Sequence, residues 1–295
     1  MTDFTANKVV ILGLGMIGAS LAAALQQLPA VERVTGWGRR PLNLDIALKN
    51  GLIDDYSLSL EEALNGADIA IIATPTLIAE QSLKEVIELA GPRCVISDVA
   101  STKGNLANVT EACESSNVTN VVLAHPIAGS EQSGAGAANA ELFQGRKVII
   151  TPLPTTNAAA QLKLQNMWLA TGADVVSMSV DEHDKILAAT SHLPHILAYS
   201  LVEALSRLDC SEDVFRFAAG GFKDFTRIAS SDPQMWAEIS VANKSEILSS
   251  IDYFQGQLSE VRSLVENAEP AALENLFDSA KQSRDHFLKV FNDKT

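Results

Sequence analysis

The chain has 295 residues, of which 47% are hydrophobic and 20% charged, a composition typical of a globular protein with one large domain or two. Its net charge of −14 argues against nucleic acid or an acidic membrane surface as a general partner. Three cysteines without C-x-x-C spacing, no N-terminal signal segment and no run of roughly 20 apolar residues favour a cytoplasmic protein.

The first motif is the segment from Lys8 to Ser20, in which closely spaced glycines follow a short apolar run. The run Val9 to Leu12 predicts a buried strand, and the Ala-rich pattern through Leu25 predicts a helix. The residues between them, Gly13, Leu14, Gly15, Met16, Ile17 and Gly18, have the G-x-G-x-x-G spacing. Such a turn also occurs in α/β proteins without a nucleotide, but the order strand, glycines, helix favours dinucleotide binding.

The end of the second predicted strand bears on the choice of cofactor. Arg33 to Gly38 predicts this strand, and Arg39 and Arg40 follow it. In NAD-binding folds an acid about 20 residues beyond the glycines holds the ribose 2′-hydroxyl, whereas an arginine accommodates a 2′-phosphate. We therefore expect NADP to be favoured, with NAD still possible. The alternative for the two arginines is a solvated basic turn.

Further strands alternate with helices through the first 179 residues. Strands are predicted at 68–73, 94–99, 121–124, 147–151 and 174–179, and helices after Ser59, at 76–90 and before the last strand. This alternation predicts a Rossmann-type, doubly wound, mostly parallel sheet. Ligands in such sheets bind at the carboxyl ends of the strands. Those ends carry Thr74, Pro75, Ser101 and His125.

From Asp181 the strand patterns stop and helical patterns continue to the C-terminus. We expect a dinucleotide-binding domain over residues 1–179 and an all-helical substrate-binding and dimerisation domain over residues 180–295. Asp232-Pro233 predicts a helix start, with the helix continuing to about Asn267 and a last helix over about 270–290. Helices this long need a partner for their apolar faces, which predicts a homodimer.

Two groups of residues can do acid–base chemistry or bind an anion. His125 ends a strand at the expected crevice, where a histidine suits general acid–base catalysis; the alternative is a structural histidine that caps the strand end. Ser101 could orient that imidazole, contact the substrate or the cofactor, or cap a helix. His192 and His195 are spaced i, i+3 on a predicted Pro-kinked helix, and substrate contact is favoured over metal binding because no accompanying ligand motif is present. Arg227, near two glycines, could bind a carboxylate or form a surface ion pair.

Together these motifs resemble the prephenate/arogenate (cyclohexadienyl) dehydrogenases of tyrosine biosynthesis. The resemblance extends from residue 8 to Trp236 and is carried by the segments 13–18, 98–103, 125–129, 191–195 and 221–227. It implies a Rossmann domain followed by a helical dimerisation domain, and prephenate or L-arogenate as the substrate. The pair Arg39 and Arg40 departs from the NAD-using members, which carry an acid there.

The resemblance also implies roles for single residues. His125 matches the catalytic base, and Ser101 the hydroxyl that works with it. Arg227 matches the arginine that binds a substrate carboxylate, and His195 a second substrate contact, with Asp224 and Trp236 near the entrance. Two other functions stay open: another small Rossmann reductase of the β-hydroxyacid or pyrroline-carboxylate type, and a non-catalytic dinucleotide-sensing module.

Overall fold

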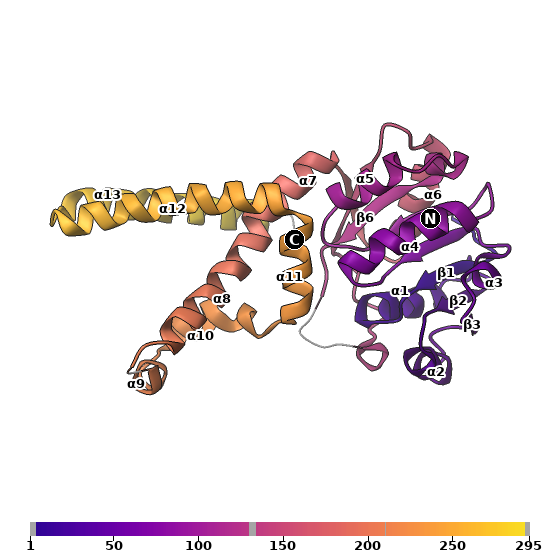
Figure 1. Ribbon diagram of the computed structural model, residues 1–295, viewed down its shortest axis with the longest axis horizontal. Coiled ribbons are helices and arrows are strands. Elements are labelled where there is room, and N and C mark those ends of the chain that lie inside the picture. The colour runs from indigo at the N-terminus through magenta and orange to yellow at the C-terminus, as the bar shows by residue number, and fades with distance from the viewer. Residues whose placement is uncertain (1–3, 130–133, 210, 293–295) are drawn as a thin grey trace. The chain divides into compact units, whose positions relative to one another are not determined.

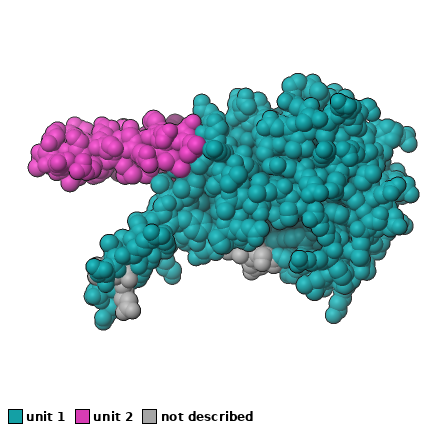
Figure 2. Space-filling view, viewed as in Figure 1, with its two compact units in different colours: residues 1–247 teal, residues 248–295 magenta. Residues whose placement is uncertain are grey.

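The computed structural model describes residues 4–129, 134–209 and 211–292. It forms two compact units, residues 1–247 and 248–295 (Figure 2). Cys210, one of the three cysteines, and residues 130–133 of the glycine-rich segment after His125 lie outside the described residues.

The first unit is built on a five-stranded parallel sheet in the order β3-β2-β1-β4-β5 (Figure 1). The strands are β1 (Val9–Leu12), β2 (Val34–Trp37), β3 (Asp55–Ser57), β4 (Ile69–Ile72) and β5 (Val95–Asp98). The parallel pairings bring the carboxyl ends of all five strands to one edge. The doubly wound, mostly parallel sheet expected from the sequence is therefore confirmed; the short strand β3 was not anticipated.

A second sheet continues the first, in the order β6-β7-β8. Its strands are β6 (Val122–Pro126), β7 (Lys147–Pro152) and β8 (Asp174–Ser177), and a parallel bridge between Ile96 and Val121 joins it to β5. Strand β7 runs antiparallel to β6, which the sequence pattern did not reveal. The described part of their connection holds only a short 3₁₀ turn, η2 (Ala135–Ala137), and a connection without a crossover helix returns the chain antiparallel.

Helices cover both faces of the large sheet. One apolar cluster packs Val9 and Ile11 against helices α1 (Met16–Gln26), α2 (Pro41–Lys49) and α6 (Ala158–Ala170). The other packs Val10 and Leu12 against α3 (Leu60–Leu64), α4 (Thr76–Leu89) and α5 (Gly104–Glu111). Successive β1 side chains point to opposite faces, so an uninterrupted apolar run is what a strand covered on both sides requires.

Helices follow β8 in the rest of this unit. They are α7 (Val180–Leu187), a π-helical turn η3 (Ala188–His192), α8 (Leu193–Ser206), α9 (Ser211–Arg216), α10 (Gly220–Thr226), the 3₁₀ turn η4 (Arg227–Ser230) and α11 (Pro233–Ala242). Another 3₁₀ turn, η1 (Ser116–Asn120), precedes β6. Ser179 caps the N-terminus of α7 in a complete capping box. Its hydroxyl accepts the backbone N–H of Glu182, and the Glu182 carboxylate accepts the backbone N–H of Ser179.

The expectation of one helix from Pro233 to about Asn267 was wrong. The helix breaks at Asn243, which separates α11 from α12 (Lys244–Glu266). Asn243 is buried with backbone angles φ −107° and ψ 39°, and its side-chain amide donates to the carbonyl of Asp184 at 2.8 Å. This bond connects the break to α7, the helix that carries Asp184.

The second unit consists of the remainder of α12 and helix α13 (Pro270–Asn292). Several of its large apolar side chains are exposed in the single chain, among them Tyr253 at 75%, Leu258 at 52% and Phe277 at 56%. No helix within the described ranges is long and apolar enough to cross a bilayer.

Candidate active site

The glycine turn after β1 has the geometry of a nucleotide-binding turn. Gly13 has a φ of +94°, which favours glycine, and a Cβ there would meet the carbonyl oxygen of Ala73 at 2.7 Å. A Cβ on Gly18 would lie 2.1 Å from the carbonyl oxygen of Gly13. A Cβ on Gly15, by contrast, would meet no atom within 4 Å. Gly13 and Gly18 are thus needed by the fold itself, whereas Gly15 leaves open space above the turn.

The other predicted cofactor residues adjoin this turn. The N–H of Gly13 donates to the carbonyl of Trp37 at 2.9 Å, which brings the end of β2 beside the glycines. Arg39 and Arg40 follow after Gly38 and are exposed, with Arg40 at the N-cap of α2. Thr74 and Pro75 follow β4, and Pro75 caps α4. The Thr74 hydroxyl is buried without a hydrogen-bond partner among the described residues.

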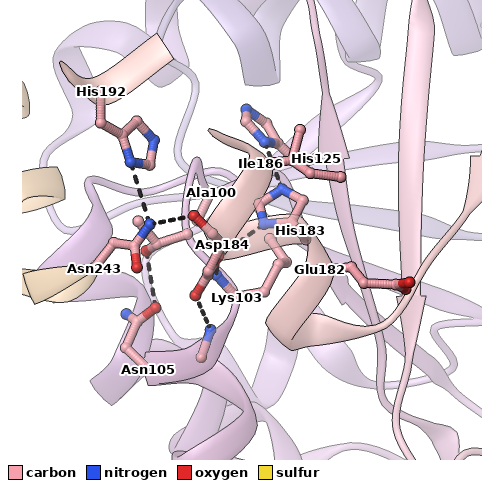
Figure 3. Close-up of polar contacts among 12 residues, drawn as sticks. Ala100, Lys103, Asn105, His125, Glu182, His183, Asp184, Ile186, His192 and Asn243 are labelled. Carbon is pink, nitrogen blue, oxygen red and sulfur yellow. Dashed lines mark hydrogen bonds and ion pairs between the residues drawn. The ribbon is translucent and has the colours of Figure 1, made fainter. Parts of the chain in front are cut away.

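His125 lies near the end of β6, and its imidazole contacts a second histidine. Its Nδ1 is 2.9 Å from Nε2 of His183 on α7, and the two rings meet edge to face at 5.1 Å (Figure 3). Burial lowers the pKa of His125 well below its usual value of 6.5, and the nearby His183, Lys103 and His192 lower it further. The imidazole is therefore neutral at physiological pH, as a general base must be.

The contact continues from His183 to a carboxylate. Nδ1 of His183 lies 2.7 Å from Oδ1 of Asp184. The same carboxylate accepts the backbone N–H groups of Lys103 at 2.9 Å and Gly104 at 2.7 Å, at the start of α5. Burial would raise the pKa of Asp184, but the hydrogen bonds from His183, Gly104 and Lys103 outweigh it and hold this pKa below its usual value. Asp184 is thus an anion shared by α7 and α5.

A buried ion pair holds the backbone next to His125. The Lys103 ammonium pairs with Asp98 at the end of β5, and both side chains are fully buried. Lys103 Nζ also donates to the carbonyl of Ala124 at 2.7 Å, and Asp98 accepts the N–H of Ala124 at 3.1 Å. The residue that precedes His125 is therefore held on both its backbone groups.

His192 and His195 meet at one aromatic side chain. His195 stacks on Trp236 with ring centroids 3.6 Å apart, and His192 lies edge to face with the same indole at 6.1 Å. Nδ1 of His192 is 3.3 Å from the amide of Asn243, which also bonds to Asp184. Burial lowers the pKa of His192 to about 4 and also lowers that of His195, to which the positive charge of Arg227 contributes.

The structure thus links four predicted residues, His125, His192, His195 and Arg227, through contacts or charge interactions. Ser101 lies half-buried between β5 and α5. Its hydroxyl makes no hydrogen bond within the described residues, and the contact on His125 Nδ1 comes from His183 instead. Sequence reasoning missed His183 and Asp184. Their one local signal is the Ser179–Glu182 capping box, which places both on the first turns of a helix.

Comparison with known proteins identifies the family that this chain matches. Residues 21–177 match the family model described as "Prephenate dehydrogenase, nucleotide-binding domain", and residues 179–279 match "Prephenate dehydrogenase, dimerization domain". A prephenate dehydrogenase of Bacillus subtilis is 38% identical over 95% of this chain and 76% of its own length. A cyclohexadienyl dehydrogenase of Zymomonas mobilis is 30% identical over 96% of both chains.

A solved structure is similar over nearly its whole length. The crystal structure of prephenate dehydrogenase from Aquifex aeolicus, in complex with hydroxyphenyl propionate and NAD+, has a TM-score of 0.89 and 30% sequence identity. The similarity covers 97% of this chain and 99% of that one.

Proposed function

This chain belongs to the prephenate dehydrogenase family, and from that premise we propose that it oxidatively decarboxylates a cyclohexadienol for tyrosine biosynthesis. The substrate is prephenate, converted to 4-hydroxyphenylpyruvate, or L-arogenate, converted to tyrosine. The observation that carries the proposal is the neutral histidine His125 near the carboxyl end of β6, in a chain segment that leads toward the glycine turn. A Cβ on Gly129, four residues beyond His125, would lie 4.0 Å from Met16 of that turn.

The role proposed for His125 follows from the chemistry of the substrate. The ring hydroxyl at C4 loses its proton to His125 as C4 loses hydride, and the bond from C1 to the carboxylate breaks to release CO2. The electron pair of that bond stays in the ring, which becomes aromatic. Aromatisation supplies most of the driving force, so the protein contributes chiefly a positioned base and a grip on the carboxylates.

The residues proposed to hold the substrate are Arg227, His195 and His192. Arg227 is a cation near His195, in a chain of net charge −14, and a guanidinium matches the planar fork of a carboxylate. Trp236 stacks on His195 and limits the positions that this imidazole can adopt. Ser101 is proposed to act with His125 on the substrate side, since His183 already contacts Nδ1.

The cofactor proposed is NADP, in preference to NAD. When bound, NADP would accept the hydride. Gly13, Leu14, Gly15, Met16, Ile17 and Gly18 would hold its pyrophosphate, with Thr74 and Pro75 beside it. The open space above Gly15 fits such a ligand. Arg39 and Arg40 are exposed where an NAD-binding fold carries an acid, which supports a contact with the 2′-phosphate.

Substitution of Arg39 tests the cofactor proposal. Charge-assisted hydrogen bonds to a phosphate contribute roughly 1.5–3 kcal/mol. Arg39→Ala should therefore raise KM for NADP by about 10- to 100-fold, while KM for NAD hardly changes and serves as the internal control. Equal losses with both cofactors would contradict a role in reading the 2′-phosphate.

We also propose a functional division at residue 179, with the dinucleotide-binding part before it and the substrate-binding and dimerisation part after it, in a homodimer. The two family matches, which meet between residues 177 and 179, support this division.

Turnover of prephenate and L-arogenate, each with NAD and with NADP, tests the proposed function directly. Appearance of reduced nicotinamide together with CO2 is the expected result. Reduced nicotinamide without CO2 would favour a hydroxyacid reductase. Binding of the dinucleotide without turnover of either substrate would favour a sensing module.

A further inference from the structure

Asp184, His183 and His125 form a line of hydrogen-bonding groups that begins at helix α5 and ends at the proposed base (Figure 3). The two links measure 2.7 Å and 2.9 Å. His183 is fully buried and Asp184 nearly so. Both histidines contribute two ring nitrogens, so the position of each proton along the line is fixed by what the neighbour can accept.

The carboxylate sets the direction of the line. Asp184 accepts two backbone N–H groups, from Lys103 and Gly104, and its pKa is lowered. An ionised carboxylate can only accept hydrogen bonds. Nδ1 of His183 must therefore carry the proton that it shares with Asp184.

The same argument passes on to His125. Burial lowers the pKa of His183 against the opposing effect of Asp184, so the ring is neutral and its Nε2 carries no proton. That bare nitrogen can only accept, so Nδ1 of His125 must be the donor in the 2.9 Å contact. His125 is neutral as well, which leaves its Nε2 with a lone pair.

We infer that His183 and Asp184 are positioning residues that hold His125 as the Nδ1–H tautomer, with Nε2 as the atom that takes the substrate proton. The inference rests on the proposed function for its catalytic meaning, but the tautomer itself does not depend on it. A general base must present an unprotonated nitrogen to the hydroxyl. In the other tautomer, Nε2 would already carry a proton and the base would be unavailable.

The line also satisfies the buried polar groups that form it. A buried histidine costs free energy unless its nitrogens are bonded, and both nitrogens of His183 are bonded. Space for the carboxylate is kept by Gly104, where a Cβ would lie 2.9 Å from Oδ2 of Asp184. The line therefore joins three elements, α5, α7 and β6, at the imidazole of His125.

Two substitutions of His183 separate positioning from packing. Gln can place its carbonyl oxygen where Nε2 of His183 lies and accept from His125, whereas Phe fills the space without any acceptor. His183→Phe should lower kcat by on the order of 10²- to 10⁴-fold, as loss of the orienting acid does in a catalytic triad. KM for the dinucleotide should stay within about 3-fold, because the nucleotide-binding turn is untouched. The kcat of His183→Gln should be at least about tenfold higher than that of His183→Phe.

Nuclear magnetic resonance of protein labelled with ¹⁵N in histidine reads the tautomer without substrate. In the wild type and in His183→Gln, the His125 signals, assigned by their loss in His125→Asn, should report a proton on Nδ1 and none on Nε2. His183→Phe should lose this single state. Should that variant fail to fold in a thermal melt, the wild-type and Gln spectra still decide.

A wild-type His125 protonated on Nε2 would overturn the inference, as would a His183→Phe variant with wild-type kcat. Failure of the proposed function looks different, because the wild type would then turn over neither prephenate nor arogenate while the spectrum still reports its tautomer.

Discussion

At the scale of single residues, the environment of His125 sets the pH dependence of the proposed reaction. Burial lowers its pKa well below 6.5, so the neutral form that accepts a proton persists below that pH. The value of kcat/KM should therefore be at its maximum above pH 6.5 and should fall only as the pH drops through the lowered pKa of His125. A steady-state profile of kcat/KM against pH should show this fall as an acidic limb, which reports the ionisation of His125 in the free enzyme.

His125→Asn tests the same residue by substitution. Asparagine retains hydrogen bonding but cannot take the proton, so kcat should fall by about 10²- to 10⁴-fold, the range of a lost general base. The acidic limb of the profile should disappear with it, while dinucleotide binding persists. A variant with wild-type kcat and an unchanged limb would place the base elsewhere, with His195 the next candidate.

Arg227 offers a second test at this scale. Truncation to Ala removes a charge-assisted bond to a carboxylate, so KM for the substrate should rise by about 100-fold or more. Lys should rescue only in part, because an ammonium cannot form the planar fork. Arg207→Ala is a matched control, since Arg207, the C-cap residue of α8, forms an exposed pair with Glu203 on that helix. An Ala variant of Arg227 with unchanged KM would return it to a surface role.

Residue types and spacing were enough to select His125, His192 and His195, because histidines are few and these end a strand or flank a proline. They were not enough to find His183. Its partner His125 is 58 positions away in the chain, and local pattern carries no information on such a pairing. The sequence placed Lys103 and Asp98 in one motif, but it did not show that they form a buried ion pair, because burial depends on the tertiary structure.

At the scale of elements, the glycine turn separates structural from ligand-facing positions. Gly18→Ala should disrupt the turn, because its Cβ would lie 2.1 Å from the carbonyl oxygen of Gly13. Gly15→Ala should leave the fold intact, since its Cβ meets no atom within 4 Å. The same substitution should weaken binding of the dinucleotide, because the added methyl group occupies the ligand's space. Thermal melting without cofactor and dinucleotide titration distinguish the two. Equal melting losses in both variants would contradict this division.

The turn between α7 and α8 shows how far a sequence defines an element. Pro194 predicted a kink, and the chain does depart from the α-helix just before it, as the π-helical turn at 188–192. Proline has no N–H to donate to the preceding turn, so the helix widens there. π-Helical turns are frequent at functional sites. The sequence indicated the position of this irregularity, but not that His192 would be buried by it.

At the scale of the whole molecule, buried neutral histidines make stability depend on pH. The pKa of His192 is about 4 in the folded chain against roughly 6.5 when unfolded. The unfolded chain therefore binds a proton first as the pH falls, so stability is lost from about pH 6.5 down to pH 4. Between pH 7 and pH 5 this one group should cost about 2 kcal/mol.

Denaturant unfolding at pH 7 and pH 5 measures that loss. His192→Asn keeps an acceptor for the amide of Asn243 but cannot titrate. The difference in unfolding free energy between the two pH values should therefore shrink by about 2 kcal/mol in this variant. An unchanged difference would mean that His192 does not titrate as its burial implies.

The apolar residues exposed on the second unit bear on assembly. Leu258 and Phe277 are 52% and 56% exposed in the single chain, and both lie within the match to a dimerisation domain at residues 179–279. Sedimentation should show a dimer that the double variant Leu258→Glu/Phe277→Glu dissociates. Leu42→Glu, at a residue that is 70% exposed on α2, should stay dimeric. An active, dilute wild-type monomer would contradict the assembly.

The overall architecture was largely predictable because strand and helix periods differ clearly in this chain. The parallel sheet and the helical C-terminal part both followed from those periods. The break at Asn243 did not, because it depends on a bond to Asp184, 59 positions earlier. The antiparallel β6–β7 pairing was equally hidden, since strand direction depends on the course of the connecting chain.

One hydrogen bond between distant segments of the first unit has an experimental use. Glu238 on α11 accepts the backbone N–H of Leu77 at 3.2 Å, in the first turn of α4 that follows Thr74 and Pro75. That amide has no partner inside its own helix, so solvent reaches it whenever α11 moves away. Its rate of hydrogen–deuterium exchange therefore reports how often this link between α11 and α4 opens, and slower exchange on addition of dinucleotide would show that the ligand stabilises the link.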